Sequence, residues 1–163
     1  MNPNTDLESA PADRAGAPSE QRILNMTPDG QAGETPRAAV RRRLEEISQA
    51  IRSKNISHLM TFYDPDVEVF DLRASLNVPG AAAYRNNLEH WFDSFDGPLS
   101  FELHNLRVVP GDSASFCHYL ALVVGARPGG RRSGYWVRGT TCFERRNGDW
   151  LVTHEHISMP AAT

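Results

Sequence analysis

The chain has 163 residues, of which 40% are hydrophobic and 23% charged, and its formal net charge is −3. This size and composition predict one soluble globular domain with a hydrophobic core. The mild charge argues against a general binder of nucleic acid or of anionic membranes. No apolar run approaches the roughly 20 residues that span a bilayer, and the N-terminus lacks the basic and apolar regions of a secretory signal. We therefore expect a cytoplasmic protein with no membrane or nucleic-acid partner.

Residues 1–34 differ in composition from the rest of the chain. This segment has no aromatic residue, few apolar ones and four prolines, at Pro3, Pro11, Pro18 and Pro28. Such a segment cannot bury enough apolar surface to offset the entropy that is lost on ordering. We therefore predict a disordered N-terminal tail at 1–34 and a folded domain at 35–160.

Three helices are predicted in the first half of this domain. The first starts at Thr35-Pro36, a fitting N-cap and first helical residue, and carries apolar residues at helical spacing as far as Ile51. The second, over 56–63, is short and ends before a proline, which disfavours helical backbone at the residue before it. A strand at 67–71 separates it from the third, an amphipathic helix that follows residue 80.

The second half of the domain has the pattern of a strand meander. Apolar and polar residues alternate in four runs, 99–109, 113–127, 132–146 and 150–159. The alternation slips near Asn105, which predicts a β-bulge there. Asn147-Gly148, between the last two runs, is a strong hairpin signal. Strands grouped in this way form an antiparallel sheet with helices packed on one face, so the predicted fold class is α+β.

Histidines stand out on two of the predicted strands. If side chains alternate regularly along the last strand, Trp150, Val152, His154, His156 and Ser158 share one face. His118 lies on one face of its own strand with apolar neighbours. If these faces converge in a cavity, the three histidines supply acid and base groups near neutral pH. A metal site with Asp71 is the less favoured interpretation, because no cysteine or second-carboxylate pattern supports it, and we predict no metal.

Two motifs give the chain a family resemblance. The sequences YDPDVEVFD at 63–71 and NGDWLVTHEH at 147–156, with the element order above, resemble the SnoaL-like group of the nuclear transport factor 2-like superfamily over about residues 36–159. The resemblance implies a cone, in which a curved, mostly antiparallel sheet wraps around a long N-terminal helix with two further helices and leaves a pocket at the open end. It also implies a homodimer formed through the outer face of the sheet. The superfamily includes ketosteroid isomerases, cyclases, dehydratases and a non-catalytic kinase association domain, so fold alone does not decide function.

Asp71 is the sharpest candidate for chemistry. Its place at the end of the first strand resembles that of the general-base aspartate of ketosteroid isomerases. A carboxylate at a pocket mouth with apolar walls can move a proton next to a carbonyl group. An aspartate at a strand end can equally hold the following loop, 72–80, by hydrogen bonds. Both interpretations stay open.

The chain departs from the isomerases in the groups that would stabilise an enolate oxygen. The resemblance implies a tyrosine on the first helix, where this chain has only Ile47 and Ser48. The second donor, an aspartic acid in the isomerases, falls near Thr141. This departure argues against steroid isomerisation. Similarity to the kinase association domain also allows another orientation of the last strand, with Thr153, Glu155 and Ile157 inward.

Trp136 and Arg138 share a face of the third strand of the meander. Arg138 is a candidate to hold an anionic ligand group, and a cross-strand ion pair is its simpler role. The chain has no glycine-rich phosphate loop and no pattern of a nicotinamide or flavin site, so we predict no cofactor.

The leading functional hypothesis is a small-molecule pocket protein that acts on an apolar carbonyl metabolite. It would catalyse proton transfer, as in isomerisation, cyclisation or dehydration, with Asp71 as base and His118 and His156 as acid or orienting groups. Trp136, Arg138 and His154 would bind the ligand. The alternative is a non-catalytic ligand-binding or oligomerisation module.

Overall fold

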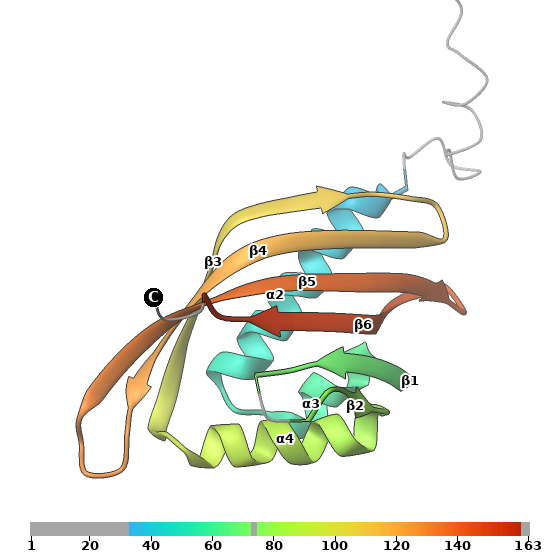
Figure 1. The fold of residues 1–163 in the computed structure, drawn as a ribbon. Coiled ribbons are helices and arrows are strands. Elements are labelled where there is room, and N and C mark those ends of the chain that lie inside the picture. Colours follow the sequence, from blue (N-terminus) through green and yellow to red (C-terminus); the bar gives the residue numbers. More distant parts are fainter. Residues whose placement is uncertain (1–32, 73–74, 161–163) are drawn as a thin grey trace, which may run out of the picture. The chain divides into compact units, whose positions relative to one another are not determined.

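The computed structural model describes residues 33–72 and 75–160, in which six strands form one sheet of order β2-β1-β6-β5-β4-β3 (Figure 1). Neighbouring strands are antiparallel except β1 and β6, which are parallel. The strands are β1 (Tyr63–Phe70), β2 (Val78–Pro79), β3 (Asp96–Val109), β4 (Ala114–Ala126), β5 (Arg132–Arg146) and β6 (Asp149–Ser158). The α+β fold class is confirmed. The predicted tail lies outside the described residues except for its last two positions, so its disorder stays a prediction.

The first two helices begin at residues whose side chains cap them. In α2 (Pro36–Arg52), the Thr35 side chain caps the first turn by accepting a hydrogen bond from the Ala38 amide at 3.3 Å. The predicted second helix is shorter than expected: α3 (Ile56–Leu59) tightens into the 3-10 turn η1 (Met60–Phe62), and β1 starts at Tyr63. The third helix is α4 (Ala81–Asp93).

The hydrophobic core lies between the helices and one face of the sheet. Helix α2 packs against β3, and α4 packs against β1. Apolar side chains that face inward from both layers, including Val40, Leu44, Val69 and Phe143, are almost fully buried. Burial of this continuous apolar surface is the main force that holds the helices on the sheet.

Lys54 ties the ends of two helices together. This lysine follows α2, and its ammonium group donates hydrogen bonds to the carbonyl oxygens of Phe92 and Phe95, at 2.9 and 2.6 Å. These carbonyls belong to the end of α4, where backbone acceptors lack helical partners and a positive charge is favourable. The contact fixes the corner where α4 leads into β3.

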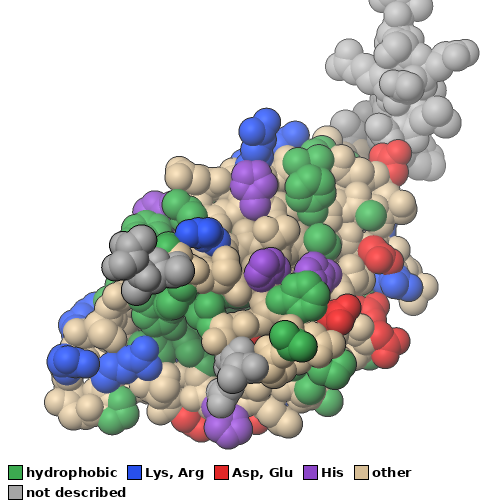
Figure 2. Space-filling model, in the orientation of Figure 1, with side chains coloured by type: hydrophobic (Ala, Val, Ile, Leu, Met, Phe, Trp, Pro, Cys, Tyr) green, Lys and Arg blue, Asp and Glu red, His purple; other side chains and the backbone are tan. Residues whose placement is uncertain are grey.

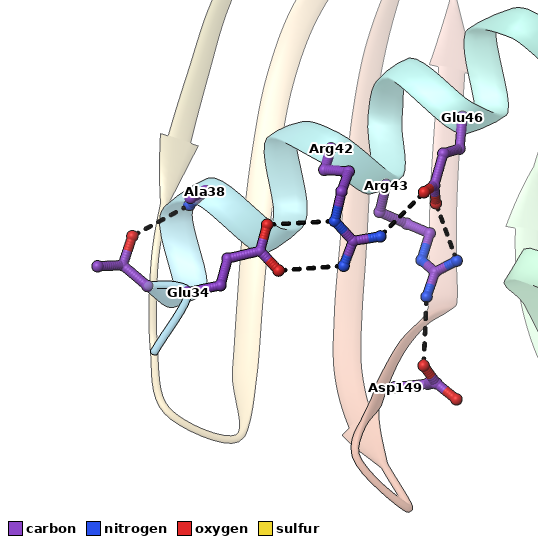
Figure 3. Close-up of polar contacts among 7 residues, drawn as sticks. Glu34, Ala38, Arg42, Arg43, Glu46 and Asp149 are labelled. Atoms are coloured by element: carbon purple, nitrogen blue, oxygen red, sulfur yellow. Dashed lines mark hydrogen bonds and ion pairs between the residues drawn. The ribbon is translucent and has the colours of Figure 1, made fainter. Parts of the chain in front are cut away.

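Polar contacts link α2 to the start of β6 (Figure 3). Arg42 bridges Glu34 and Glu46, and Arg43 bridges Glu46 and Asp149, with N–O distances from 2.9 to 3.5 Å. Most of these groups are partly exposed, so each pair contributes at most about 1 kcal/mol. The network therefore orients α2 more than it stabilises the fold.

Two of the irregularities in the sheet bear on the predictions from the sequence. Asn105 has a positive φ of 53°, and the β3–β4 register shifts between His104 and Arg107, so the predicted bulge is confirmed. A second bulge was not foreseen. In the β5–β6 ladder, Phe143 pairs with Val152 and Cys142 pairs with His154, which leaves Thr153 without a partner.

The bulge at Thr153 reverses the alternation of β6. Trp150 and Val152 face the core as expected, but the next core-facing residue is Glu155, not His154. The expectation that His154 and His156 share a face with Trp150 and Val152 is therefore corrected, because one extra residue moves every later side chain to the opposite face.

None of the helices in the described part of the chain is long and apolar enough to cross a membrane.

Candidate active site

A cavity of about 260 Å³ lies between the helices and the inner face of the sheet. Its walls are mostly apolar, with Leu44, Ile47, Ile51, Leu88, Phe101 and Val137 among them. Concave apolar pockets with a few polar groups are the usual form of small-molecule sites. At about 30 Å³ for each water molecule, the volume equals that of roughly nine waters, enough for a one-ring or two-ring molecule.

A buried carboxylate with hydroxyl partners forms the polar part of this cavity. Glu155 is only 5% exposed and lines the cavity. Its Oε2 accepts hydrogen bonds from the hydroxyls of Tyr63 and Tyr84, at 3.0 and 2.8 Å. Its Oε1 lies 3.2 Å from the Thr141 hydroxyl and 3.4 Å from that of Tyr119. Both carboxylate oxygens are thus within reach of two donors.

Five elements bring these side chains together. Glu155 stands on β6 beside Thr141 on β5, and the two are paired in the sheet. Tyr63 begins β1 and Tyr84 lies in the first turn of α4. Tyr119 reaches the cluster from β4 by lying across β5. We name Glu155 with these four hydroxyl residues the glutamate cluster.

Gly139 makes room for the Tyr119 ring. The two residues are paired across β4 and β5, and a Cβ atom at position 139 would lie 2.3 to 2.7 Å from three atoms of the tyrosine side chain. Only glycine leaves this space open. Tyr119 can therefore lie flat over the sheet and place its hydroxyl 3.3 Å from that of Thr141.

Burial controls the protonation of the cluster. Loss of hydration raises the pKa of Glu155, and the Asp71 charge acts in the same direction, while the hydroxyl hydrogen bonds oppose them. Burial, followed by the charge of Glu155, also raises the pKa of the tyrosines well above the ordinary value. Tyr63, Tyr84 and Tyr119 are therefore neutral hydroxyl donors at any physiological pH.

Asp71 lies in the wall of the same cavity, at the end of β1. It is half-buried, and its Oδ1 accepts a hydrogen bond of 2.7 Å from the amide of Leu72. The carboxylate therefore holds the start of the loop and also borders the cavity. Both interpretations drawn from the sequence are compatible with this geometry.

Another hydroxyl in the cavity wall, outside the glutamate cluster, can donate a hydrogen bond to a ligand. The Trp91 indole N–H donates to the Tyr135 hydroxyl oxygen at 2.8 Å. Both residues line the cavity. Because the indole occupies an acceptor position of this oxygen, the hydroxyl hydrogen of Tyr135 stays available for a ligand.

Five of the predicted site residues lie elsewhere. His118, His156, Trp136 and Arg138 are exposed on the sheet face that points away from the helices, and none of them lines the cavity. His154, on the same face, is half-buried, and its Nδ1 lies 2.8 Å from the Glu68 carbonyl oxygen. The structure thus does not bring these residues together with Asp71. The expected convergence of the histidine faces in a cavity is not met.

The outer face gathers hydrophobic and histidine side chains, as Figure 2 shows. Phe70 packs edge-on against His154 and His156, and Trp136 packs against His104. In the described residues, no group of three or more His, Cys, Asp or Glu side chains is arranged to hold a metal ion.

Sequence reasoning missed the glutamate cluster. The inward orientation of Glu155 and Ile157 was noted only as an alternative, and regular alternation argued against it. Ile47, Ser48 and Thr141, near which the resemblance to the isomerases implies the oxygen-stabilising donors, do line the cavity. The Ser48 hydroxyl donates to its own helix, to the Leu44 carbonyl at 2.8 Å, so the helix itself holds that hydrogen.

Comparison with known proteins now fixes the family. The profile of the SnoaL-like domain matches residues 40–162, which is most of the chain. The chain belongs to the SnoaL-like family. No curated protein matches this SnoaL-like chain.

Solved structures agree with this assignment. An NTF2-like protein of unknown function from Pseudomonas putida is 28% identical, with a TM-score of 0.70, over 80% of this chain and 92% of that one. An NTF2-like superfamily protein from Salmonella enterica is 14% identical, with a TM-score of 0.68, over 76% and 90%. The association domain of CaMKII from C. elegans is 18% identical, with a TM-score of 0.61, over 74% and 92%. These similarities confirm the predicted NTF2-like fold.

Proposed function

We propose that this SnoaL-like protein binds a small, largely apolar carbonyl metabolite in its cavity and catalyses proton transfer on it. Isomerisation, cyclisation and dehydration belong to this reaction class. The proposal rests on one observation: an apolar cavity whose wall includes a half-buried carboxylate, Asp71, and a hydroxyl that can donate, Tyr135.

The proposed roles follow from these two groups. Asp71 takes a proton from the carbon next to the carbonyl, and the electron pair of that C–H bond moves to the carbonyl oxygen. The Tyr135 hydroxyl donates a hydrogen bond to this oxygen and stabilises the developing negative charge. Asp71 then returns the proton to a different carbon, so the substrate is isomerised with no net change in atoms. The glutamate cluster binds a polar group of the ligand.

The alternative, a non-catalytic module, is not favoured. It would be supported by a cavity filled with Phe and Leu side chains and an Asp71 turned away from it. Instead the cavity is open at about 260 Å³, and Asp71 is in its wall.

The test uses 3-cyclohexen-1-one, a small ketone that becomes a conjugated, ultraviolet-absorbing enone when it is isomerised. We expect the wild-type protein to accelerate this conversion over buffer. The substitution Asp71→Asn removes the base and should lower kcat/KM by about a hundredfold or more.

The matched control is Asp66→Asn, an exposed aspartate on the same strand, which should leave the rate unchanged. If the wild-type protein gave no acceleration, and no exchange of the ketone's α-hydrogens in D₂O, the proposed function would be wrong. Equal rates for the two variants would remove Asp71 from the mechanism.

We also propose that the protein is a homodimer formed through the outer face of the sheet. Four large apolar side chains on β1, β4 and β5 are exposed there: Phe70, Phe116, Leu120 and Trp136. Apolar side chains that gather on one face, rather than being scattered singly, often mark an interface.

A further inference from the structure

The cavity has an unusual charge balance. The described residues in its wall include two carboxylates, Asp71 and Glu155, and no lysine or arginine. The one basic side chain among them is His90, which is exposed on α4. A carboxylate buried as deeply as Glu155 is normally paired with a cation, because an unpaired buried charge is costly.

The hydrogen-bond directions in the glutamate cluster decide what it offers a ligand. A tyrosine hydroxyl has one hydrogen, and Tyr63 and Tyr84 donate theirs to Glu155. Their oxygens keep lone pairs, so they can only accept a further hydrogen bond. The cluster therefore presents acceptors to the cavity, and the group that fits it is a donor.

The walls near the cluster suit a cation. Six aromatic side chains border the cavity: Tyr63, Tyr84, Trp91, Phe101, Tyr119 and Tyr135. The faces of aromatic rings attract ammonium groups, by about 0.5–2 kcal/mol for each contact depending on exposure. A primary ammonium group also has three N–H donors, which matches the acceptors of the cluster.

We propose that the cavity selects a small hydrophobic amine, with its ammonium group against Glu155 and its apolar body along α2. This inference rests on the proposed function, since it names the substrate class of the same site. The substrate would carry a basic nitrogen held by Glu155 and a carbonyl group within reach of Asp71 and Tyr135.

The charges around Glu155 support this assignment. Among the described residues, four hydroxyls hydrogen-bond to Glu155, and the charge that acts most on its pKa is the carboxylate of Asp71. Burial raises the pKa of Glu155, because its charged form loses hydration that these groups do not fully replace. An ammonium group beside Glu155 would supply the missing positive charge.

The test measures binding by calorimetry at neutral pH with three ligands of similar shape: 2-phenylethylamine, 2-phenylethanol and phenylacetate. We expect the amine to bind at least about tenfold more tightly than the alcohol, and the carboxylate to bind most weakly. In Glu155→Gln, which keeps the size of the side chain, the preference for the amine over the alcohol should disappear.

The order of the three binding affinities in the wild-type protein tests the inference even if Glu155→Gln does not fold. Equal or tighter binding of the alcohol or the carboxylate, no binding of any of the three, or an unchanged amine preference in Glu155→Gln would overturn it. The two proposals can fail independently of each other. Amine preference without turnover of 3-cyclohexen-1-one would contradict only the proposed proton transfer. Turnover without amine preference would contradict only the proposed selection of an amine.

Discussion

At the scale of single residues, Glu155 shows how burial and hydrogen bonds act in opposite directions on the pKa of a carboxyl group. Moving a carboxylate out of water costs several kcal/mol, even after the protein relaxes around it. Each hydrogen bond from a hydroxyl stabilises the charged carboxylate by about 1.5–3 kcal/mol. The pKa of Glu155 is raised despite three such bonds that lower it, so burial is the larger effect.

Stability should therefore depend on pH through this residue. Because the pKa in the folded state is above the ordinary carboxyl value of 4.5, the stability that Glu155 contributes is complete below that pH. It is lost as the pH rises toward the folded-state pKa, by about 1.4 kcal/mol for each pH unit between the unfolded-state and folded-state pKa values. Relative to the wild type, Glu155→Gln should gain free energy of unfolding as the pH rises from 4.5.

Urea unfolding of both proteins over a series of pH values measures this difference. The exposed Asp112→Asn variant provides the baseline, and it should show no such trend against the wild type. A difference between wild type and Glu155→Gln that stays flat across the series would contradict the prediction.

The sequence was enough to identify Asp71 as a candidate site residue, but it was not enough to assign the histidines to a face of the sheet. Asp71 stands at a strand end, where its neighbours in sequence fix its location. The orientation of His154, in contrast, depends on whether β6 is regular up to that point. The inward orientation of Glu155 was only an alternative, because regular alternation after Trp150 and Val152 places it on the opposite face.

At the scale of elements, the two bulges differ in how visible they are in the sequence. At Asn105 the apolar alternation itself slips, and asparagine tolerates positive φ. Near Thr153 the sequence gives no such sign, since a regular strand with Trp150, Val152 and His154 on one face is equally acceptable by polarity. Sequence periodicity predicted the strands and the Asn147-Gly148 turn, where both residues have positive φ. It could not predict the faces beyond an unseen bulge.

The β4–β5 pair offers a test of how tightly the cluster is packed. In Gly139→Ala, the added methyl group would overlap the Tyr119 ring. We expect a loss of about 1–3 kcal/mol in the free energy of unfolding, measured by urea unfolding. Replacing Tyr119 by leucine in the same chain should return part of the loss, because the two sites are coupled.

Gly134→Ala is the matched control, since it lies on the same strand and its added methyl group meets the Val124 side chain no closer than 3.1 Å. If Gly139→Ala were as stable as this control, the ring of Tyr119 would not lie over β5 as described.

At the scale of the whole molecule, the outer face of the sheet is the feature to test. Trp136 is 46% exposed and Phe116 is 43% exposed. If this face joins two copies, Trp136→Glu should bury an unpaired charge and favour the monomer. Sedimentation velocity should then find a dimer for the wild type and a monomer for the variant.

Arg41→Glu, a charge change at an exposed position of α2, is the control and should stay dimeric. A wild-type protein that sediments as a monomer at all concentrations would disprove the homodimer. A dimer that survives Trp136→Glu would place the interface elsewhere.

The position of Lys54 has a practical consequence for chemical labelling. It is the only lysine of the 163-residue chain, and its ammonium group is bound to two carbonyls at the end of α4. An acylating reagent needs a free amine, so it can react there only while the Lys54 side chain has left the two carbonyl oxygens. The rate of acylation at this single side chain therefore reports how often the contact between Lys54 and the end of α4 breaks.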